Sequence, residues 1–159
     1  MTQYTAPIAD MKFVFEEVFD FYSHYQKYPA YQETTADLVD MIMSECGKLC
    51  ESELAPLYQS GDKEGCQFDD GVVTTPKGFK EAYQQYIEGG WHGLSHPVEY
   101  GGQGLPQSVG LIRTEMVGTA NWAWGMYSGL TLGAMNTLIE HASEQQKNMF
   151  LHKLTSGEW

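Results

Sequence analysis

Two pairs of side chains that can bind metals stand four residues apart: Cys46 with Cys50, and His92 with His96. Residues at this spacing share one face of a helix, so either pair could supply half of a metal site. The cysteines lie on an apolar stripe with no second pair of ligands elsewhere, and buried cysteine behaves as a small hydrophobic residue. The histidines are interrupted by glycine and followed by proline, which disfavours a helix there. We therefore predict core packing for Cys46 and Cys50 and assign no metal site.

A stretch of 18 residues without any charge, Trp122 to Ile139, offers a different chemistry. Four polar side chains within it could face a cleft: Tyr127, Ser128, Thr131 and Asn136. Its glycines recur every four residues and would form one bare stripe on a helix: Gly125, Gly129 and Gly133. Because each glycine costs roughly 1 kcal/mol relative to alanine in a helix, a close neighbour is expected along this stripe. We interpret the stretch as a central buried helix beside a ligand or another backbone.

Two simpler interpretations of this stretch stay open. The glycines could serve only close helix packing, without any ligand. A charge-free run of this length could also be a transmembrane helix, in which Gly-x-x-x-Gly is a pairing motif. Against the membrane alternative, no cluster of Lys and Arg stands at either end, and Asn136 lies within the run. We therefore favour a helix that packs and also forms the wall of a pocket.

The composition excludes several classes of partner. The chain has 159 residues, 42% of them hydrophobic, which is enough for one core in one domain. Nine basic and 21 acidic residues give a net charge of -12, which repels nucleic acid and anionic membrane surfaces. Three cysteines cannot all pair, and the charged N-terminal segment does not resemble a signal peptide. We expect a cytoplasmic protein that neither binds nucleic acid nor inserts into a membrane.

Hydrophobic periodicity predicts the elements of the first half of the chain. An amphipathic helix is expected over residues 10–25, with Asp10 as its cap. The longest periodic run covers residues 34–54, with Thr34 or Thr35 as the cap. Asp70 and Gly71 form a hairpin dipeptide, which predicts a small two-stranded ribbon within residues 66–74.

Three further helix starts follow from proline and capping residues. Pro76 opens a helix that ends at Gly89 and Gly90, and its apolar face carries Phe79, Ala82, Tyr83, Tyr86 and Ile87. Pro106 opens a long helix, whose buried side carries Val109, Ile112, Met116 and Ala120. Asn121 is expected to cap the central helix that follows.

Ser143 and Gln146 form a capping box for the last helix, and Gly157 stands just beyond its final turn. Together these signals predict an all-α fold, an orthogonal or up-down bundle of about six helices with one small β-hairpin near residues 66–74.

A glycine-rich loop spans residues 90–106, between two predicted helices. Loops of this kind sometimes hold phosphate with their backbone N–H groups. This one lacks the Lys-Ser/Thr of a P-loop and does not follow a strand, so we favour a structural turn.

This loop and the residues around it resemble the acyl-CoA dehydrogenase family, and within it the N-terminal helical domain. The matching loop residues are Gly90, Trp91, Pro97, Tyr100, Gly101, Gly102 and Gly104. The resemblance continues through Glu115, Ala120, Gly129 and Gly133 to residues 144–147 and 154–159. Motifs in residues 4–13, 66–71 and 75–80 resemble the long subgroup of that family, which includes 3-methylmercaptopropionyl-CoA dehydrogenase.

The resemblance implies an FAD-dependent oxidoreductase that desaturates an acyl-CoA thioester between its α and β carbons. In the family a carboxylate base removes the α-proton while the β-hydrogen leaves as hydride to the flavin. That base and most flavin contacts belong to later domains, so the resemblance assigns no catalytic residue here and leaves the cofactor-binding residues unknown. It does imply that the central helix helps to wall the acyl pocket. The candidate substrate-binding residues are Met126, Tyr127, Leu130, Thr131, Ala134 and Met135.

The same resemblance implies acyl-CoA as substrate, electron-transfer flavoprotein as electron acceptor, and a homo-oligomer. Since a large apolar side chain, Trp159, stands at the very end, we expect a chain cut before the flavin-binding β-domain, inactive and without FAD on its own. Residues 1–33 would form an extension with one helix, and residues 34–159 the main bundle. An apolar patch is expected around the central helix and Trp159. A non-catalytic helical interaction module remains the alternative function.

Overall fold

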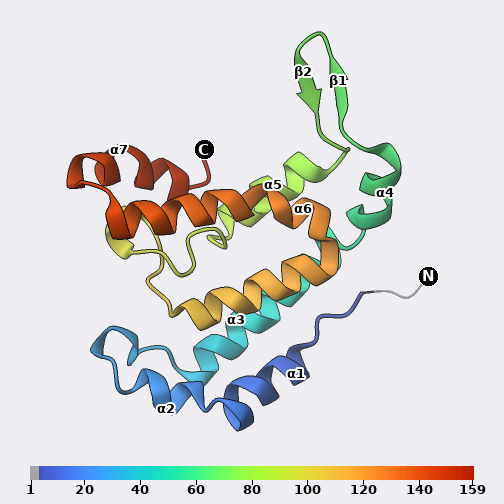
Figure 1. Cartoon of the computed structure of the whole chain (residues 1–159). Coiled ribbons are helices and arrows are strands. Elements are labelled where there is room, and N and C mark those ends of the chain that lie inside the picture. Colours follow the sequence, from blue (N-terminus) through green and yellow to red (C-terminus); the bar gives the residue numbers. More distant parts are fainter. Residues whose placement is uncertain (1–3) are drawn as a thin grey trace.

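The protein is mostly helical in its computed structural model, which describes residues 4–159 (Figure 1). Within this range the elements are α1 (Ile8–Phe13), α2 (Phe21–Tyr25), α3 (Ala36–Leu49), α4 (Leu57–Glu64), β1 (Gln67–Asp69), β2 (Val72–Thr74), α5 (Phe79–Glu88), α6 (Gln107–His141) and α7 (Glu144–Thr155). Short π-helical turns cover Val14–Val18 and Cys50–Leu54, and short 3₁₀ turns cover Pro29–Tyr31 and Val98–Tyr100. The predicted all-α fold with one small hairpin is confirmed.

The longest helix, α6, bends at Asn121, where φ is -160° and ψ is 89°. Figure 1 shows its two halves, 107–120 and 122–141, diverging from this bend as amber and orange arms. Asn121 Oδ1 accepts a hydrogen bond from the backbone N–H of Trp124 at 3.1 Å, and its Nδ2 donates to the carbonyl of Leu54 at 3.1 Å. The predicted cap of the central helix is therefore confirmed, and the same side chain fixes the bend to the rest of the fold.

The main core lies between α3, α5 and the first half of α6. The four residues predicted on the buried side of this half are all buried: Val109, Ile112, Met116 and Ala120. Cys46 and Cys50 have no exposed surface and are unpaired, as the core interpretation requires. Thr35 caps α3, since its hydroxyl accepts a hydrogen bond from the N–H of Leu38 at 3.3 Å.

A second, smaller core joins the second half of α6 to α7 and the 3₁₀ turn Val98–Tyr100, and its buried members are Tyr100, Met135 and Leu151. The capping box of α7 is present as predicted, with Ser143 and Gln146 bonded reciprocally. Gly157 follows with φ of 73°, and a Cβ there would lie 2.1 Å from Ile87 Cδ1. The chain end is thereby held against α5.

Two predicted helix starts are wrong. The helix expected over residues 10–25 is broken in two, because Asp20 adopts a left-handed φ of 45° and caps α2 by accepting a hydrogen bond from Ser23. Asp10 does not cap α1, which begins at Ile8. Likewise α5 begins at Phe79, after Gly78 with φ of 88°, and Pro76 does not open it.

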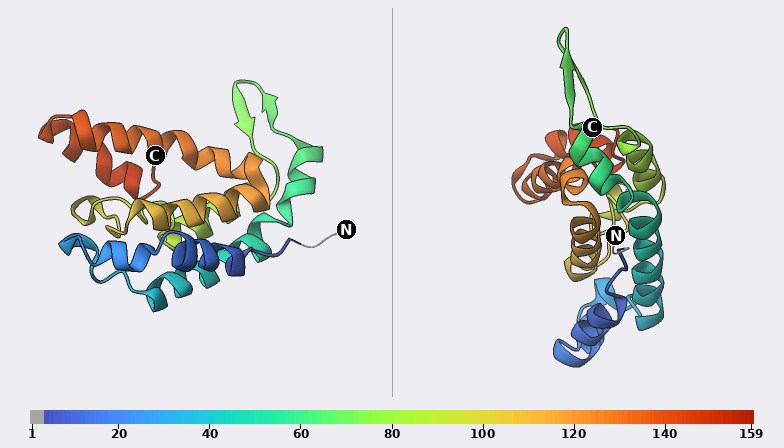
Figure 2. Two further views of the ribbon diagram at one scale, coloured as in Figure 1. Left: turned by 60° about the horizontal axis from the view of Figure 1, so that its bottom comes forward. Right: turned by 90° about the vertical axis from the view of Figure 1, so that its right-hand side faces the viewer.

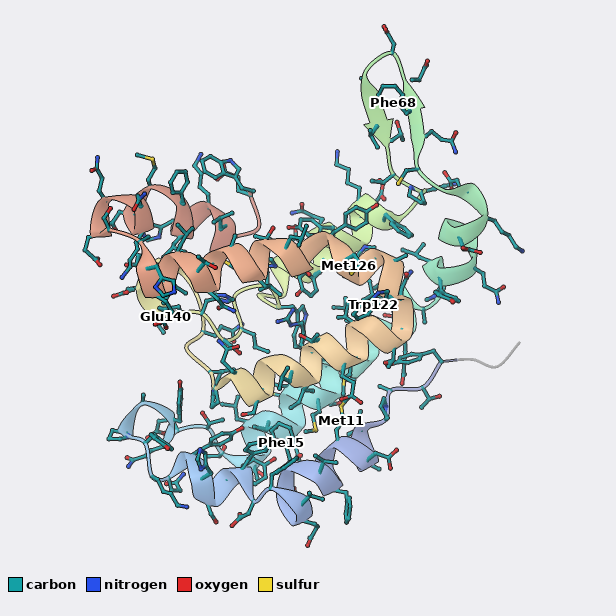
Figure 3. All side chains as sticks on the ribbon, in the orientation of Figure 1. Met11, Phe15, Phe68, Trp122, Met126 and Glu140 are labelled. Carbon is teal, nitrogen blue, oxygen red and sulfur yellow. The ribbon has the colours of Figure 1, made fainter. Side chains whose placement is uncertain are left out.

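The hairpin β1–β2 pairs Phe68 with Val73 in antiparallel register, and Asp70 and Gly71 form its turn with φ of 43° and 80°. The predicted turn dipeptide is thus confirmed. Figure 2 shows the hairpin standing away from the helices in both views. Phe68, labelled in Figure 3, is 75% exposed there.

The second half of α6 is not the buried helix that its composition predicts. Trp122 is 62% exposed and Leu130 is 83% exposed. A Cβ on Gly129 or Gly133 would meet no atom within 4 Å, so the close neighbour expected along the glycine stripe is absent at these two positions. Among residues 4–159, no helix combines the length and the hydropathy needed to cross a bilayer.

Candidate functional site

A pocket of about 510 Å³ lies where the hairpin, α5, the second half of α6 and the chain end meet. Its walls are mostly aromatic and apolar, and its lining residues are Val73, Thr74, Thr75, Phe79, Lys80, Tyr83, Tyr127, Thr131 and Trp159. This volume suits a small ligand or part of a larger one. Among the described residues that line the pocket, Lys80 is the only one with a charged side chain, and none has a carboxylate side chain.

Tyr127 stands in the wall of this pocket with partners on two sides. The aromatic rings of Phe79 and Tyr127 pack edge to face, with centroids 6.1 Å apart and an interplanar angle of 86°. The Tyr127 hydroxyl lies 3.8 Å from Cys66 Sγ, at the base of the hairpin. Burial, and then the neighbouring thiol, raise the pKa of Tyr127, so the phenol is neutral at pH 7. It can donate a hydrogen bond but is not a base.

The six predicted substrate-binding residues do not all reach this pocket. Tyr127 and Thr131 line it together, one helical turn apart. Met126, labelled in Figure 3, is 50% exposed, and neither it nor Leu130 nor Ala134 lines the pocket. Met135 lies one further turn along the helix and is fully buried against α7, where the hydroxyl of Thr155 donates to its sulfur at 3.5 Å.

Sequence reasoning missed several residues of this pocket. It placed Phe79 and Tyr83 only in the packing face of their helix, although both also line the pocket. Tyr83 further donates its hydroxyl to the carbonyl of Gly157 at 3.4 Å, which helps to hold the chain end near the pocket. Thr74 and Lys80 belong to no periodic pattern in the sequence. They reach the pocket because the turn between the hairpin and α5 brings them there.

A buried polar cluster lies between the two halves of α6, built from Arg113, Tyr86, His92 and His96. Arg113 Nη1 donates to the Tyr86 hydroxyl at 3.1 Å. Burial and the nearby guanidinium lower the pKa of His92 to about 4, and they also lower the pKa of His96. Both imidazoles are therefore neutral at pH 7. Within residues 4–159 there is no group of three or more His, Cys, Asp or Glu side chains that could hold a metal ion.

Cys50, in the main core, is a poor nucleophile. A hydrogen bond with Cys46, together with burial, raises the pKa of the Cys50 thiol far above its usual range. The thiolate that nucleophilic or metal-binding chemistry needs is thus disfavoured.

The glycine-rich loop uses its own backbone donors. The N–H groups of residues 100–105 all donate to carbonyls of the same loop, those of Pro97, Val98, Gly93, His96 and Leu94. A Cβ on Gly102 would lie 2.1 Å from the carbonyl oxygen of His96, so the loop closes tightly on itself. These donors are occupied, which supports the structural turn over the phosphate cradle.

Comparison with known proteins adds independent findings. The family model described as "Acyl-CoA dehydrogenase, N-terminal domain" matches residues 37–158. The chain is 38% identical over 156 residues to 3-methylmercaptopropionyl-CoA dehydrogenase of Ruegeria pomeroyi, covering 98% of this chain and 26% of that protein. It is 31% identical over 161 residues to butyryl-CoA dehydrogenase of Syntrophomonas wolfei, covering 98% and 26%. A match of 31% over 113 residues to mitochondrial isovaleryl-CoA dehydrogenase of Pongo abelii covers 70% and 25%. The chain thus spans about a quarter of the length of these relatives.

Proposed function

The chain belongs to the acyl-CoA dehydrogenase family and corresponds to the N-terminal domain of that family, and we propose that it forms part of the acyl pocket wall in an enzyme that desaturates acyl-CoA thioesters. The observation that carries this proposal is the pocket beside Tyr127 and Thr131, with its aromatic walls and without a carboxylate. Such walls hold an apolar chain and exclude water from it. The proton-abstracting base is therefore proposed to lie outside these residues.

Neither the glycine-rich loop nor the candidate pocket is well suited to the diphosphate of FAD, the cofactor that family membership implies. The backbone N–H groups of loop residues 100–105 are occupied, and the described lining of the candidate pocket offers a single cation, Lys80. We therefore propose that the flavin contacts come from other parts of the complete enzyme. Electron-transfer flavoprotein as acceptor and a homo-oligomer belong to the same proposal and rest on family membership alone.

A division of the chain into an extension, residues 1–33, and a main bundle, residues 34–159, is also proposed. The start of the family match at residue 37 supports this boundary.

The test uses a substitution that narrows the pocket and leaves the fold intact. In the complete gene product, Thr131→Trp places a large ring in the pocket, so oxidation of long acyl-CoA substrates should fall by at least about tenfold relative to short ones. The neighbouring Leu130→Trp is the matched control, because Leu130 is 83% exposed and lies outside the pocket. The assay measures kcat/KM across a series of acyl-chain lengths, with flavin content checked for each variant.

Two results would contradict the proposal. An equal change of the chain-length profile in both variants would show that this pocket does not select the acyl chain. A folded, flavin-loaded wild-type protein without activity on any acyl-CoA would reject the enzyme assignment and favour the interaction module.

A further inference from the structure

A second concave surface runs along the outer face of the first half of α6, away from the pocket at Tyr127. It consists of two adjoining hollows, of about 240 Å³ and about 510 Å³, which share Leu111 and Glu115. The first hollow is closed by the N-terminal segment, where Figure 3 shows Met11 and Phe15 between α1 and α6. The second reaches Trp122 at the bend. We name the two hollows together the outer groove.

The outer groove is lined by large apolar side chains that the chain leaves uncovered. Phe19 is 60% exposed, Leu111 is 65% exposed and Trp122 is 62% exposed. Its lining runs from Ser108 to Trp122, which corresponds to roughly 20 Å along a helix. Contiguous apolar surface of this kind is typical of a binding site, and the length suits about four turns of a partner helix.

An unusual backbone shapes the closed end of the groove. Val14–Val18 forms a π-helical turn, and Asp20 holds a left-handed φ of 45°, which a residue other than glycine rarely adopts. Phe19 and Phe21, on either side of Asp20, both line the first hollow. The strained residue Asp20 thus lies between the two phenylalanines whose rings line the groove.

Acidic groups without basic partners surround these apolar residues. Asp10 and Glu115 line the groove, and Glu16, Glu17 and Asp20 are exposed on the same N-terminal segment. None of these five carboxylates takes part in an ion pair among the described residues. The two basic residues of the groove elements are engaged elsewhere, because Lys12 pairs with Asp40 and Arg113 is buried against Tyr86. The surface therefore favours a cationic occupant.

We propose that the outer groove binds an amphipathic, basic helix of a separate protein, with its apolar side chains in the two hollows and its Lys or Arg side chains at Asp10 and Glu115. A second copy of this chain is a poor occupant, since each copy carries a net charge of -12. A later segment of the same polypeptide is the competing occupant, and the experiment on the complete gene product distinguishes it from a separate protein.

The experiment uses the complete gene product and a fluorescently labelled peptide of about 16 residues, a helix with leucine on one face and lysine on the flanks. Fluorescence anisotropy gives its Kd. We expect Leu111→Ala and Trp122→Ala each to weaken binding by about tenfold, the loss typical of a central interface residue. These changes keep the net charge, so general attraction of a basic peptide to an acidic protein cannot explain the loss. Glu115→Gln should weaken binding as well, and more strongly at low salt.

Leu130→Ala is the matched control, because Leu130 is an apolar residue on the other half of α6 and is even more exposed than Leu111. This variant should leave the Kd unchanged. A peptide with glutamate in place of lysine should fail to bind. Equal losses from Leu111→Ala and Leu130→Ala would overturn the proposal in favour of non-specific contact. An absence of binding to the folded complete product would also overturn it, since the groove is then covered by the same polypeptide. So would self-association that Leu111→Ala abolishes, since the occupant is then a second copy.

Discussion

The first half of α6 carries Arg113 and Glu115, whereas the second half has no charge from Trp122 to Ile139. Despite this, the first half is the better buried of the two. It places Val109, Ile112 and Met116 in the main core, while the second half leaves Leu130 83% exposed. Apolar content therefore indicates how much apolar surface a helix carries. Hydrophobic periodicity decides which face of the helix is buried within the same chain.

The largest expected effect compares one side chain from each half. Met116→Ala removes a side chain with no exposed surface, so the free energy of unfolding should fall by about 2 to 5 kcal/mol. Leu130→Ala removes a side chain that touches little, so the change should stay within about 0.5 kcal/mol. Urea denaturation of both variants measures the difference. Similar losses would mean that the second half is covered in solution.

The elements that sequence reasoning predicted well are those with a local physical signal. The caps at Thr35, Asn121 and Ser143 each need only a side-chain oxygen three residues before an unpaired N–H. The hairpin turn at Asp70 and Gly71 follows from backbone preference alone. Such features depend on a few neighbouring residues, so the sequence contains them fully.

The errors concern features that depend on the rest of the fold. The apolar periodicity of residues 10–25 continues across Asp20, so it gives no sign of the break there, which occurs where α1 and α2 pack on the main core. The burial of Met135 and the exposure of Leu130 likewise depend on α7, which covers one side of the second half only. Tyr127 and Thr131 were assignable to the pocket, but its other walls come from distant segments that no local pattern connects.

The next effect concerns the polar cluster that joins the two halves. The pKa of His92 is lowered from 6.5 to about 4 in the folded protein by burial and Arg113, so the unfolded chain binds a proton first as the pH falls. The contribution of His92 to stability is complete above pH 6.5 and is lost as the pH falls from 6.5 to 4, by at most about 3 kcal/mol. The lowered pKa of His96 acts in the same direction.

Urea denaturation at a series of pH values measures this loss, and His92→Phe serves as the comparison. That variant lacks the titrating group, so its stability should depend less steeply on pH in the same range. Because carboxylates also titrate there, the difference between the two proteins is the quantity of interest. Identical slopes would mean that His92 has the same pKa in the folded and unfolded states, so that burial and Arg113 do not lower it.

The smallest effect, and the sharpest contrast, comes from one glycine in each half. Gly129→Ala adds a methyl group where no atom lies within 4 Å, so the gain in helix propensity should raise the free energy of unfolding by roughly 0.5 to 1 kcal/mol. Gly110→Ala gains the same propensity, but its Cβ would lie 2.5 Å from Ser95 Oγ, and Ser95 holds the start of α6 by donating to the carbonyl of Pro106. Overpacking costs typically about 1 to 3 kcal/mol, so this variant should be less stable than the wild type. Thermal or urea unfolding measures whether each variant has a higher or a lower free energy of unfolding than the wild type. If Gly129→Ala also destabilises the complete gene product, another part of that product packs against the stripe, and the exposure of the second half belongs to residues 1–159 alone.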